Sequence, residues 1–273
     1  MGAGLGWALR DGGARVVTSV AGRSPRTERH AEAARLELLP DLEAVVATAD
    51  VILLVTPPGA AVEAAAAVGE AARRTRARPL VADLNAVAPS TVDEIAAALA
   101  PLDLVDGSIS GAPPNERPGA RIYLSGPRAG EVAGLPWRHV TTVVVGDVTG
   151  RASAVKMCTA SVYKGLSGLL TQAIRTGAHY GVLEYVLEDL RQGGFDGVAA
   201  SVALAATKSA RYVAEMREIA AAQAGAGLPA ALFDGYARVY AEIADSPLAR
   251  ENAESVDRDM SAAEVVDRLR ATA

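Results

Sequence analysis

Short apolar runs alternate with Ala-rich stretches in the first half of the chain. Between Arg15 and Gly146 the runs are rich in Val, Ile and Leu, and the stretches between them have helical length, which is typical of a sheet wound with helices. One such helix is predicted over Thr91–Leu99, with Ser90 or Thr91 as its N-cap. The predicted strands of this parallel sheet are Arg15–Val20, Val51–Val55, Leu80–Leu84, Asp103–Ser108, Arg121–Gly126 and Thr141–Gly146.

After Gly150 the pattern changes to long Ala, Leu and Val stretches at helical spacing, and we expect no strand from there to Ala273. Helix breaks are predicted at Gly193 and over Gly225–Pro229. The acidic, polar segment Arg250–Leu269 is typical of a solvated terminal helix. The second half is therefore predicted to be a separate, all-helical domain.

Composition narrows the class of protein. Half of the 273 residues are apolar, and a net charge of -5 argues against a nucleic-acid partner, since such proteins carry basic surfaces. Pro and Glu interrupt the apolar stretches before they reach the length of a membrane span, so we expect a cytoplasmic protein. The single cysteine, Cys158, excludes an intrachain disulfide, and three scattered histidines indicate no metal site.

The glycines at the start of the chain are typical of a dinucleotide-binding loop, Gly-x-Gly-x-x-Gly, which normally follows a buried strand. Gly12 marks the end of the helix that precedes Arg15–Val20, and three helical turns counted back from it reach Gly2. We therefore expect Gly2 to be the last glycine of the loop, with the first strand and the other glycines upstream of Met1. The alternative is a flexible, glycine-rich N-terminus that binds no cofactor.

The segment "GRSPRT" follows the first predicted strand, at the place where an NAD enzyme carries an acidic residue for the ribose hydroxyl. It holds Arg23, Ser24, Arg26 and Thr27 instead, and their charges and hydroxyls suit a 2′-phosphate. This favours NADP over NAD as the cofactor. An ordinary basic turn is the alternative.

Four further segments carry a family resemblance: "VTPP", which contains Thr56, Pro57 and Pro58, then "DLNAVAPST", "DGSISGAPP" and "GRASAVKMCTASVYKG". In this order and at this spacing the chain resembles the β-hydroxyacid dehydrogenase superfamily, and most of all a bacterial branch of 6-phosphogluconate dehydrogenase-like proteins with a distinct C-terminal domain. The resemblance implies a Rossmann-type, NADP-binding α/β domain in residues 1–149 and a helical substrate and dimerisation domain in residues 150–273. It also implies hydride transfer between nicotinamide and a small anionic hydroxy acid or related carbonyl compound.

Thr56, Asn85 and Ser110 each follow the end of a predicted strand, and ligands bind in the crevice at such strand ends. The resemblance places Asn85 beside the nicotinamide, and it makes Ser110 and Gly111 the group that holds the substrate carboxylate. Ala112 stands where the family has a third glycine, which puts the substrate geometry in doubt. A simple turn at this point is the alternative.

Lys156 matches the family lysine that moves the proton of the substrate hydroxyl, a task that suits an ammonium because burial lowers its pKa. Ala160 replaces the asparagine of the family motif. Lys164 lies two turns further along the same helix face, where it is predicted to depress the Lys156 pKa by charge repulsion and to favour an anionic substrate. Tyr163 and Glu215 are secondary substrate-site candidates, and a solvated helix face is the alternative for all of these positions.

Two other functions remain open at this point. Imine reductases share the architecture but usually carry Asp or Tyr at the position of Lys156. A non-catalytic cofactor-sensing or scaffold protein is the second alternative. Ala160 and the missing first strand favour it.

Overall fold

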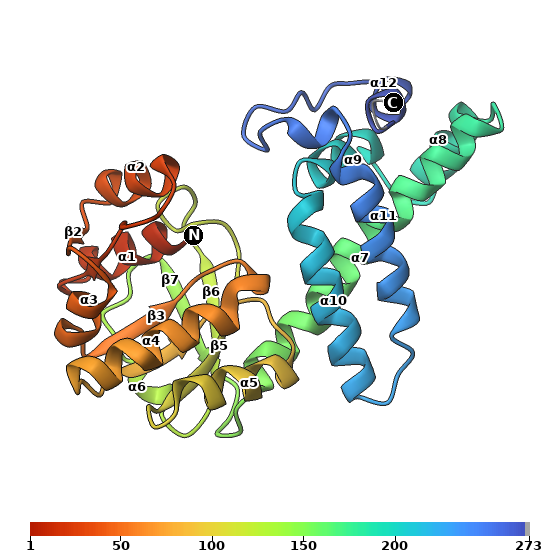
Figure 1. The fold of residues 1–273 in the computed structure, drawn as a ribbon. Coiled ribbons are helices and arrows are strands. Elements are labelled where there is room, and N and C mark those ends of the chain that lie inside the picture. Colours follow the sequence, from red (N-terminus) through yellow and green to blue (C-terminus); the bar gives the residue numbers. More distant parts are fainter. Residues whose placement is uncertain (271–273) are drawn as a thin grey trace. The chain divides into compact units, whose positions relative to one another are not determined.

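The computed structural model describes residues 1–270, so the last three residues of the predicted helical domain, 271–273, lie outside the described part. The chain divides into two compact units, Met1–Met157 and Cys158–Ala273 (Figure 1). Helix α7 (Arg151–His179) begins directly after Gly150, where the helical domain was predicted to start. The boundary between the units therefore falls inside this helix.

The first unit alternates strands and helices. Its helices are α1 (Gly2–Asp11), α2 (Pro25–Ala33), α3 (Leu42–Thr48), α4 (Ala61–Thr75), α5 (Pro89–Leu99) and α6 (Ala129–Ala133), with the 3-10 helix η1 (Pro58–Ala60). Its strands are β1 (Val17–Thr18), β2 (Glu37–Leu38), β3 (Val51–Leu54), β4 (Leu80–Asp83), β5 (Leu104–Ser110), β6 (Ala120–Ser125) and β7 (Val140–Val144).

Strands β3 to β7 form one sheet in chain order, and β1 and β2 form a separate parallel pair. The predicted parallel pairing is confirmed for β3 with β4, β4 with β5, and β6 with β7. It is wrong for β5 and β6, which pair antiparallel with Ile109 opposite Ile122. Residues 111–119 join these two strands without a helix, and they are fewer than the dozen or so residues that a parallel crossover needs.

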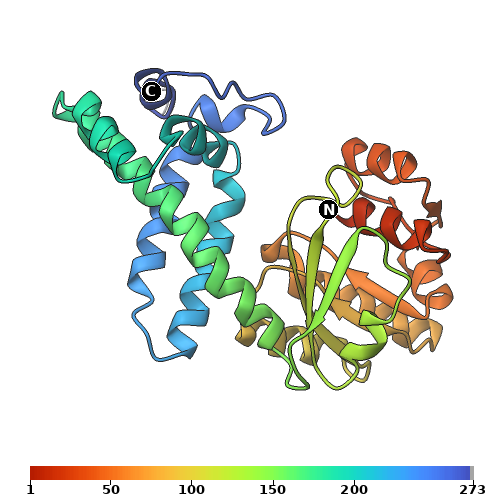
Figure 2. The same ribbon diagram turned by 180° about the vertical axis from the view of Figure 1, so that it is seen from behind.

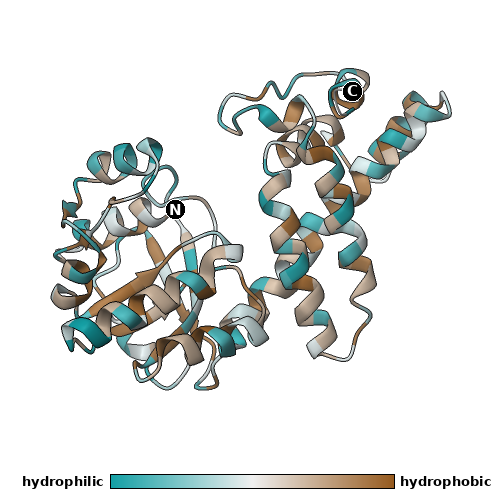
Figure 3. Cartoon of the chain, in the orientation of Figure 1, coloured by the Kyte–Doolittle hydropathy of each residue, from teal (hydrophilic) through white to brown (hydrophobic). Residues whose placement is uncertain are grey.

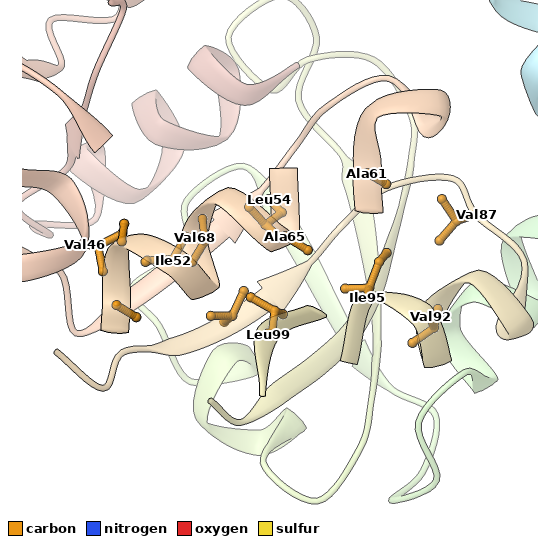
Figure 4. Packing of buried hydrophobic residues seen from close by; sticks show 13 residues of the cluster. Val46, Ile52, Leu54, Ala61, Ala65, Val68, Val87, Val92, Ile95 and Leu99 are labelled. Carbon is orange, nitrogen blue, oxygen red and sulfur yellow. The ribbon is translucent and has the colours of Figure 1, made fainter. Parts of the chain in front are cut away.

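Side chains alternate between the faces of this sheet, and helices cover both faces. Ile52, Leu54 and Val81 pack with α3, α4 and α5 in one buried cluster (Figure 4). Leu80 and Ala82 point the other way and pack with α1 and α6. Figure 1 shows α4 and α5 in front of the sheet, and Figure 2, from behind, shows the opposite face. Each fully buried Val, Leu or Ile contributes about 1.5–3 kcal/mol to this doubly wound fold.

Helix α1 extends from Gly2 to the C-cap Gly12, as the spacing of the glycines predicts. It buries Gly4, Leu5 and Leu9, so the alternative of a flexible N-terminus is wrong. A Cβ atom built on Gly12 would lie 1.6 Å from the carbonyl oxygen of Pro136, so this end of the helix has room only for glycine.

Two local predictions for the first unit need correction. The first predicted strand shrinks to two residues, β1, because its partner β2 is equally short and lies exposed. The N-cap of α5 is Ala88, and neither Ser90 nor Thr91, because Pro89 occupies the first helical position, where its missing N–H costs nothing.

The second unit is helical. After the remainder of α7 come α8 (Leu183–Gln192), α9 (Val198–Ala206), α10 (Ser209–Gly225), α11 (Ala231–Ala244), the 3-10 helix η2 (Leu248–Arg250) and α12 (Ala262–Arg268). The predicted breaks at Gly193 and after Gly225 are confirmed, and no strand occurs among the described residues that follow Gly150. Helices α10 and α11 pack side by side (Figure 1). Tyr236 of α11 lies against Gly168 of α7.

The predicted terminal helix over Arg250–Leu269 is wrong in most of its length. Apart from Arg250, the last residue of η2, only α12 is helical in this segment, because Ser261 and Glu264 form a capping box that starts the helix there. Before it, the side chain of Asn252 accepts a hydrogen bond from the N–H of Glu254, which favours a turn over a helix. The apolar side of α12 is buried, so this helix packs on its unit rather than standing in solvent.

Hydropathy follows the burial pattern in both units. Strand β3 is hydrophobic over most of its length, whereas the helices that cover the sheet mix hydrophilic and hydrophobic positions (Figure 3). Within residues 1–270, the helices are all too short or too polar to cross a lipid bilayer.

Candidate cofactor and substrate site

The carboxyl ends of β3 and β4 are joined by the side chain of Asn85. Leu54 lies opposite Asp83 in the sheet, so the residues that follow these strands are neighbours. The backbone N–H of Thr56 donates a hydrogen bond to Asn85 Oδ1 over 2.6 Å, and Asn85 Nδ2 donates to Asp83 Oδ1 over 2.6 Å. Asn85 is 2% exposed. The structure therefore brings two of the predicted site residues, Thr56 and Asn85, into direct contact.

Asp83 is a buried acid that the sequence analysis missed. Burial raises the pKa of its carboxyl group to about 7, the hydrogen bonds from Asn85 oppose the shift, and the nearby Asp106 adds to it. A signal was available, because an acidic residue at the end of a predicted buried strand needs a polar partner. The partner is the amide of Asn85, so Asp83 fixes the orientation of that side chain.

The Thr56 side chain supplies a polar atom without a partner. Its hydroxyl oxygen is buried, and within the described residues no group forms a hydrogen bond with it. The neighbouring Pro57 is exposed, and Pro58 is buried as the first residue of η1. A buried hydroxyl without a partner loses hydrogen-bonding energy, so a ligand group that bonded to it at this strand end would be favoured.

Helix α1 begins at the same edge of the sheet. A Cβ atom built on Gly2 would lie 3.7 Å from Val55, which precedes Thr56. A Cβ atom on Gly4 would lie 3.0 Å from Pro113, in the loop after β5. The helix has no side-chain N-cap, and the first N–H groups of a helix have no acceptor within it. The absence of side chains at Gly2 and Gly4 thus leaves a helix N-terminus, which favours anions, close to the ends of β3 and β5.

Lys156 lies at the end of β5. Its ammonium group donates a hydrogen bond to the carbonyl oxygen of Ile109 over 2.8 Å. One turn earlier in α7, the carbonyl of Ala152 accepts a hydrogen bond from the Ser108 hydroxyl over 2.7 Å. Lys156 therefore sits beside the residue that precedes Ser110, at the same sheet edge as Thr56 and Asn85.

Ser110 is exposed as the last residue of β5, and Gly111 follows it with a φ of 121°. A Cβ atom on Gly111 would lie 3.0 Å from the Cα of Ala120, so both the backbone angle and the space require glycine here. The last paired residues of β4 and β5 are Asp83 and Asp106. Ser110 lies beyond this pair, and the turn leaves its side chain accessible.

The "GRSPRT" segment forms the start of α2. Ser24 is its N-cap, and the Ser24 hydroxyl accepts a hydrogen bond from the N–H of Thr27 over 3.4 Å. Arg23, Arg26 and Thr27 are all exposed. Two arginines thus stand at a helix N-terminus, an arrangement that suits a phosphate group.

The remaining predicted site residues belong to the second unit. Lys164 of α7 forms an ion pair with Glu215 of α10, and Arg211 Nε lies 3.2 Å from the other oxygen of the same carboxylate. Burial lowers the pKa of Lys164, while Glu215 opposes this shift. Tyr163 is 73% exposed. The substrate-binding and pKa-tuning roles of Lys164, Tyr163 and Glu215 stay predictions.

Two family models match parts of this chain, and several solved structures resemble it. Residues 1–133 match the NAD binding domain of 6-phosphogluconate dehydrogenase, and residues 178–243 match a domain of unknown function, DUF1932. A conserved protein described as structurally similar to 3-hydroxyacid dehydrogenases is 28% identical, with a TM-score of 0.65 and coverage of 89% of this chain and 93% of that chain. A conserved hypothetical protein from Sinorhizobium meliloti is 25% identical, with a TM-score of 0.67 and coverage of 98% and 92%.

The fold also extends to a more distant enzyme. A 3-hydroxyisobutyrate dehydrogenase of Mycobacterium tuberculosis, solved with L-serine, is 18% identical, with a TM-score of 0.64 and coverage of 99% of this chain and 96% of that chain. The N-terminal NAD-binding domain, the separate C-terminal domain and the dehydrogenase fold lead to one assignment. The chain matches the 6-phosphogluconate dehydrogenase-like superfamily with a distinct C-terminal domain.

Proposed function

We propose that this protein is an NADP-dependent oxidoreductase that interconverts a small anionic hydroxy acid and the corresponding carbonyl compound. The observation that carries the proposal is the position of the Lys156 ammonium group, which is held at the end of β5 by the carbonyl of Ile109. Ligands of doubly wound folds bind at this edge of the sheet. A titratable group at that edge suits proton transfer to and from a substrate oxygen.

The residues at the same edge fit a nicotinamide dinucleotide. The N-terminus of α1 suits the pyrophosphate. The buried Thr56 hydroxyl, which has no partner among the described residues, suits a hydroxyl of the ribose or the carboxamide of the nicotinamide. Arg23 and Arg26, at the start of α2, suit the 2′-phosphate that distinguishes NADP from NAD. A bound nicotinamide supplies the hydride donor or acceptor.

The chain's own groups then account for the remaining chemistry. Lys156 donates a proton to the substrate oxygen during reduction and accepts it during oxidation, because an ammonium group can lose its proton and a guanidinium cannot. The Ser110 hydroxyl and the open backbone at Gly111 bind the carboxylate of the substrate. The hydrogen bond to Asp83 fixes the amide of Asn85, which would then offer a polar group of set orientation to a bound nicotinamide.

We also propose that the protein is a homodimer through its second unit. Large apolar side chains stand exposed on α7 and α8, among them Leu169, which is 55% exposed, and Tyr185, which is 79% exposed. Helix α8 has no buried residue at all. A second copy of the chain packed against α7 and α8 would remove these apolar side chains from water. Light scattering of Leu169→Glu with Tyr185→Glu should then show a monomer, whereas Glu184→Ala, a polar neighbour, should leave the dimer intact.

Binding and turnover test the enzymatic proposal. NADPH should bind more tightly than NADH, and a panel of short hydroxy acids and their keto forms should include a substrate. Lys156→Ala should lower kcat about 10²–10⁴-fold with NADPH affinity unchanged, and Lys156→Arg should not restore it. Arg175→Ala, near the other end of the same helix, where the side chain pairs with Glu242, is the control.

The alternatives give different results. Turnover of a cyclic imine without turnover of any hydroxy acid would favour an imine reductase. NADPH binding without turnover of any of these compounds would favour a cofactor-sensing or scaffold protein. Near-normal kcat in Lys156→Ala on a hydroxy acid would show that another group moves the proton.

A further inference from the structure

A buried carboxylate of the first unit, outside the residues assigned so far, accepts several hydrogen bonds. Asp106 lies inside β5 and is fully buried. Its Oδ2 atom accepts hydrogen bonds from the Ser125 hydroxyl over 2.7 Å and from the backbone N–H groups of Gly150, Ala152 and Ser153 over 3.0, 3.0 and 3.1 Å. Its Oδ1 atom accepts one from the Ser153 hydroxyl over 2.6 Å.

Three of these donors are backbone groups at the start of α7, which lacks an acidic residue of its own in its first turn. A carboxylate at this position satisfies N–H groups that have no acceptor within the helix, and it interacts favourably with the helix dipole. Asp106 therefore acts as the N-cap of α7, although it is 44 residues away from Gly150 in the chain.

The same strand carries the acceptor of the Lys156 ammonium group. Asp106 and Ser108 lie two residues apart in β5, so their side chains point to the same face of the sheet. Ser108 bonds to the carbonyl of Ala152, and Lys156 follows Ala152 by four residues, which is one turn on the same face of α7. Ile109, directly after Ser108, accepts the hydrogen bond from Lys156.

The register of α7 against β5 thus decides where the ammonium group lies. A shift of α7 by one residue turns its side chains by about 100° around the helix axis, which would carry Lys156 away from Ile109. The hydrogen bonds from the N–H groups of Gly150, Ala152 and Ser153 to Asp106 oppose such a shift. If these bonds were removed, the Ser108 hydroxyl would still hold the carbonyl of Ala152, but the helix start would lose the carboxylate that caps it.

We propose that Asp106 is the positioning residue for Lys156: its carboxylate fixes the register of α7 on β5 and thereby holds the ammonium group at the end of the strand. The inference deepens the proposed function, because it assumes that Lys156 moves the proton. Asp106 itself touches neither substrate nor cofactor in this assignment.

The rarity of lysine in this chain gives a direct readout that needs no substrate. Lys156, Lys164 and Lys208 are its only lysines, so protein with ¹³C-labelled lysine gives three ε-methylene signals, assigned by single Lys→Arg variants. Asp106→Leu keeps the branched shape of the side chain but offers no acceptor, and it should move the Lys156 signal toward that of a free lysine. The Lys164 and Lys208 signals should stay in place. Val68→Ala, which creates a cavity in the buried cluster of α3, α4 and α5, should move none of the three lysine signals.

Kinetics with NADPH and the substrate provide the second readout. Asp106→Leu should lower kcat about 10²-fold with little change in KM, and Asp106→Asn should recover part of this loss because its amide oxygen can still accept the backbone bonds. In a Lys156→Ala background, Asp106→Leu should cause almost no further loss, since residues that act as a unit are not additive.

The outcomes separate the two proposals. An unmoved Lys156 signal in folded Asp106→Leu, or a full further loss of kcat in the Lys156→Ala background, overturns the positioning role. A moved signal together with full activity of Lys156→Ala supports the positioning role and overturns the proposed proton transfer. If Asp106→Leu does not fold, Ser153→Ala and Ser125→Ala, which each remove one hydroxyl donor, should move the Lys156 signal by a smaller amount, and no movement in either overturns the proposal.

Discussion

The side-chain amide of Asn85 donates a hydrogen bond to the carboxyl group of Asp83 over 2.6 Å, deep in the edge where β3 and β4 end. Burial, with the nearby Asp106 as a smaller cause, raises the pKa of that carboxyl group to about 7. The buried pair therefore contains a group that titrates within the range in which most enzymes work.

The raised pKa makes the free energy of unfolding depend on pH. In the unfolded chain Asp83 titrates near its ordinary value of 3.8, so between that value and about 7 the folded protein binds more protons than the unfolded one. The stability that this group contributes is fully present below pH 3.8 and is lost as the pH rises through 7. We expect urea unfolding to show a decrease on the order of 2 kcal/mol between pH 5 and 8.5.

Asp83→Asn should abolish this decrease, because an amide does not titrate. Asp103→Asn, which changes an exposed aspartate paired with Arg128, should keep it. An equal slope in Asp83→Asn and the unsubstituted protein would assign the pH dependence to other groups.

The ion pair of Lys164 with Glu215 leads to a second prediction. Both side chains are largely buried, with exposed fractions of 14% and 7%. Glu215→Gln leaves a buried ammonium without its full counter-charge, so it should lower the Lys164 pKa further and reduce the free energy of unfolding by about 3–5 kcal/mol. Replacement of both partners, Lys164→Met with Glu215→Leu, should cost less than the single change. Urea unfolding at pH 7 measures both.

An exposed pair provides the matched control. Arg191 and Glu188 of α8 form a similar contact at the surface, and Glu188→Gln should cost less than about 1 kcal/mol. Equal costs for Glu188→Gln and Glu215→Gln would mean that burial adds nothing to the pair with Lys164.

The parts of the fold that the sequence predicts well are those with continuous local patterns. Val51–Leu54 and Leu80–Ala82 are unbroken apolar runs, and such runs are typical of strands covered on both faces. β2 lacks this pattern, since Glu37 and Leu38 are both exposed. The antiparallel pairing of β5 with β6 depends on the connection between them, which is short and contains no helix, rather than on the sequence of either strand.

The same difference between local patterns and distant contacts applies to the candidate site. Thr56 and Asn85 could be placed together because each follows a strand, and the ends of neighbouring parallel strands meet. The contacts of Asp106 with Gly150 and of Lys164 with Glu215 could not be found this way, since they join residues far apart in the chain. A buried acid in an apolar strand signals that a partner exists without identifying it.

Close packing at the end of α1 gives a third prediction. Gly12→Ala would place a Cβ atom 1.6 Å from the carbonyl oxygen of Pro136, and this backbone atom cannot rotate away. We expect a loss of at least about 1–3 kcal/mol in the free energy of unfolding. Gly235→Ala in α11 meets no atom within 4 Å, so it should stabilise the protein by about 0.5–1 kcal/mol. A neutral Gly12→Ala would show that α1 can move away from Pro136.

The start of α2 gives the last prediction, which concerns the choice of cofactor. Arg23 precedes the N-cap Ser24, and no acidic residue stands beside it to bind a ribose hydroxyl. Arg23→Ala should weaken NADPH binding by about 1.5–3 kcal/mol, the range for a hydrogen bond to a charged group, and leave NADH binding nearly unchanged. Arg29→Ala, further along the same helix, is the control and should affect neither cofactor. Calorimetry with both cofactors measures the difference, and equal losses for NADPH and NADH in Arg23→Ala would show that this arginine does not read the 2′-phosphate.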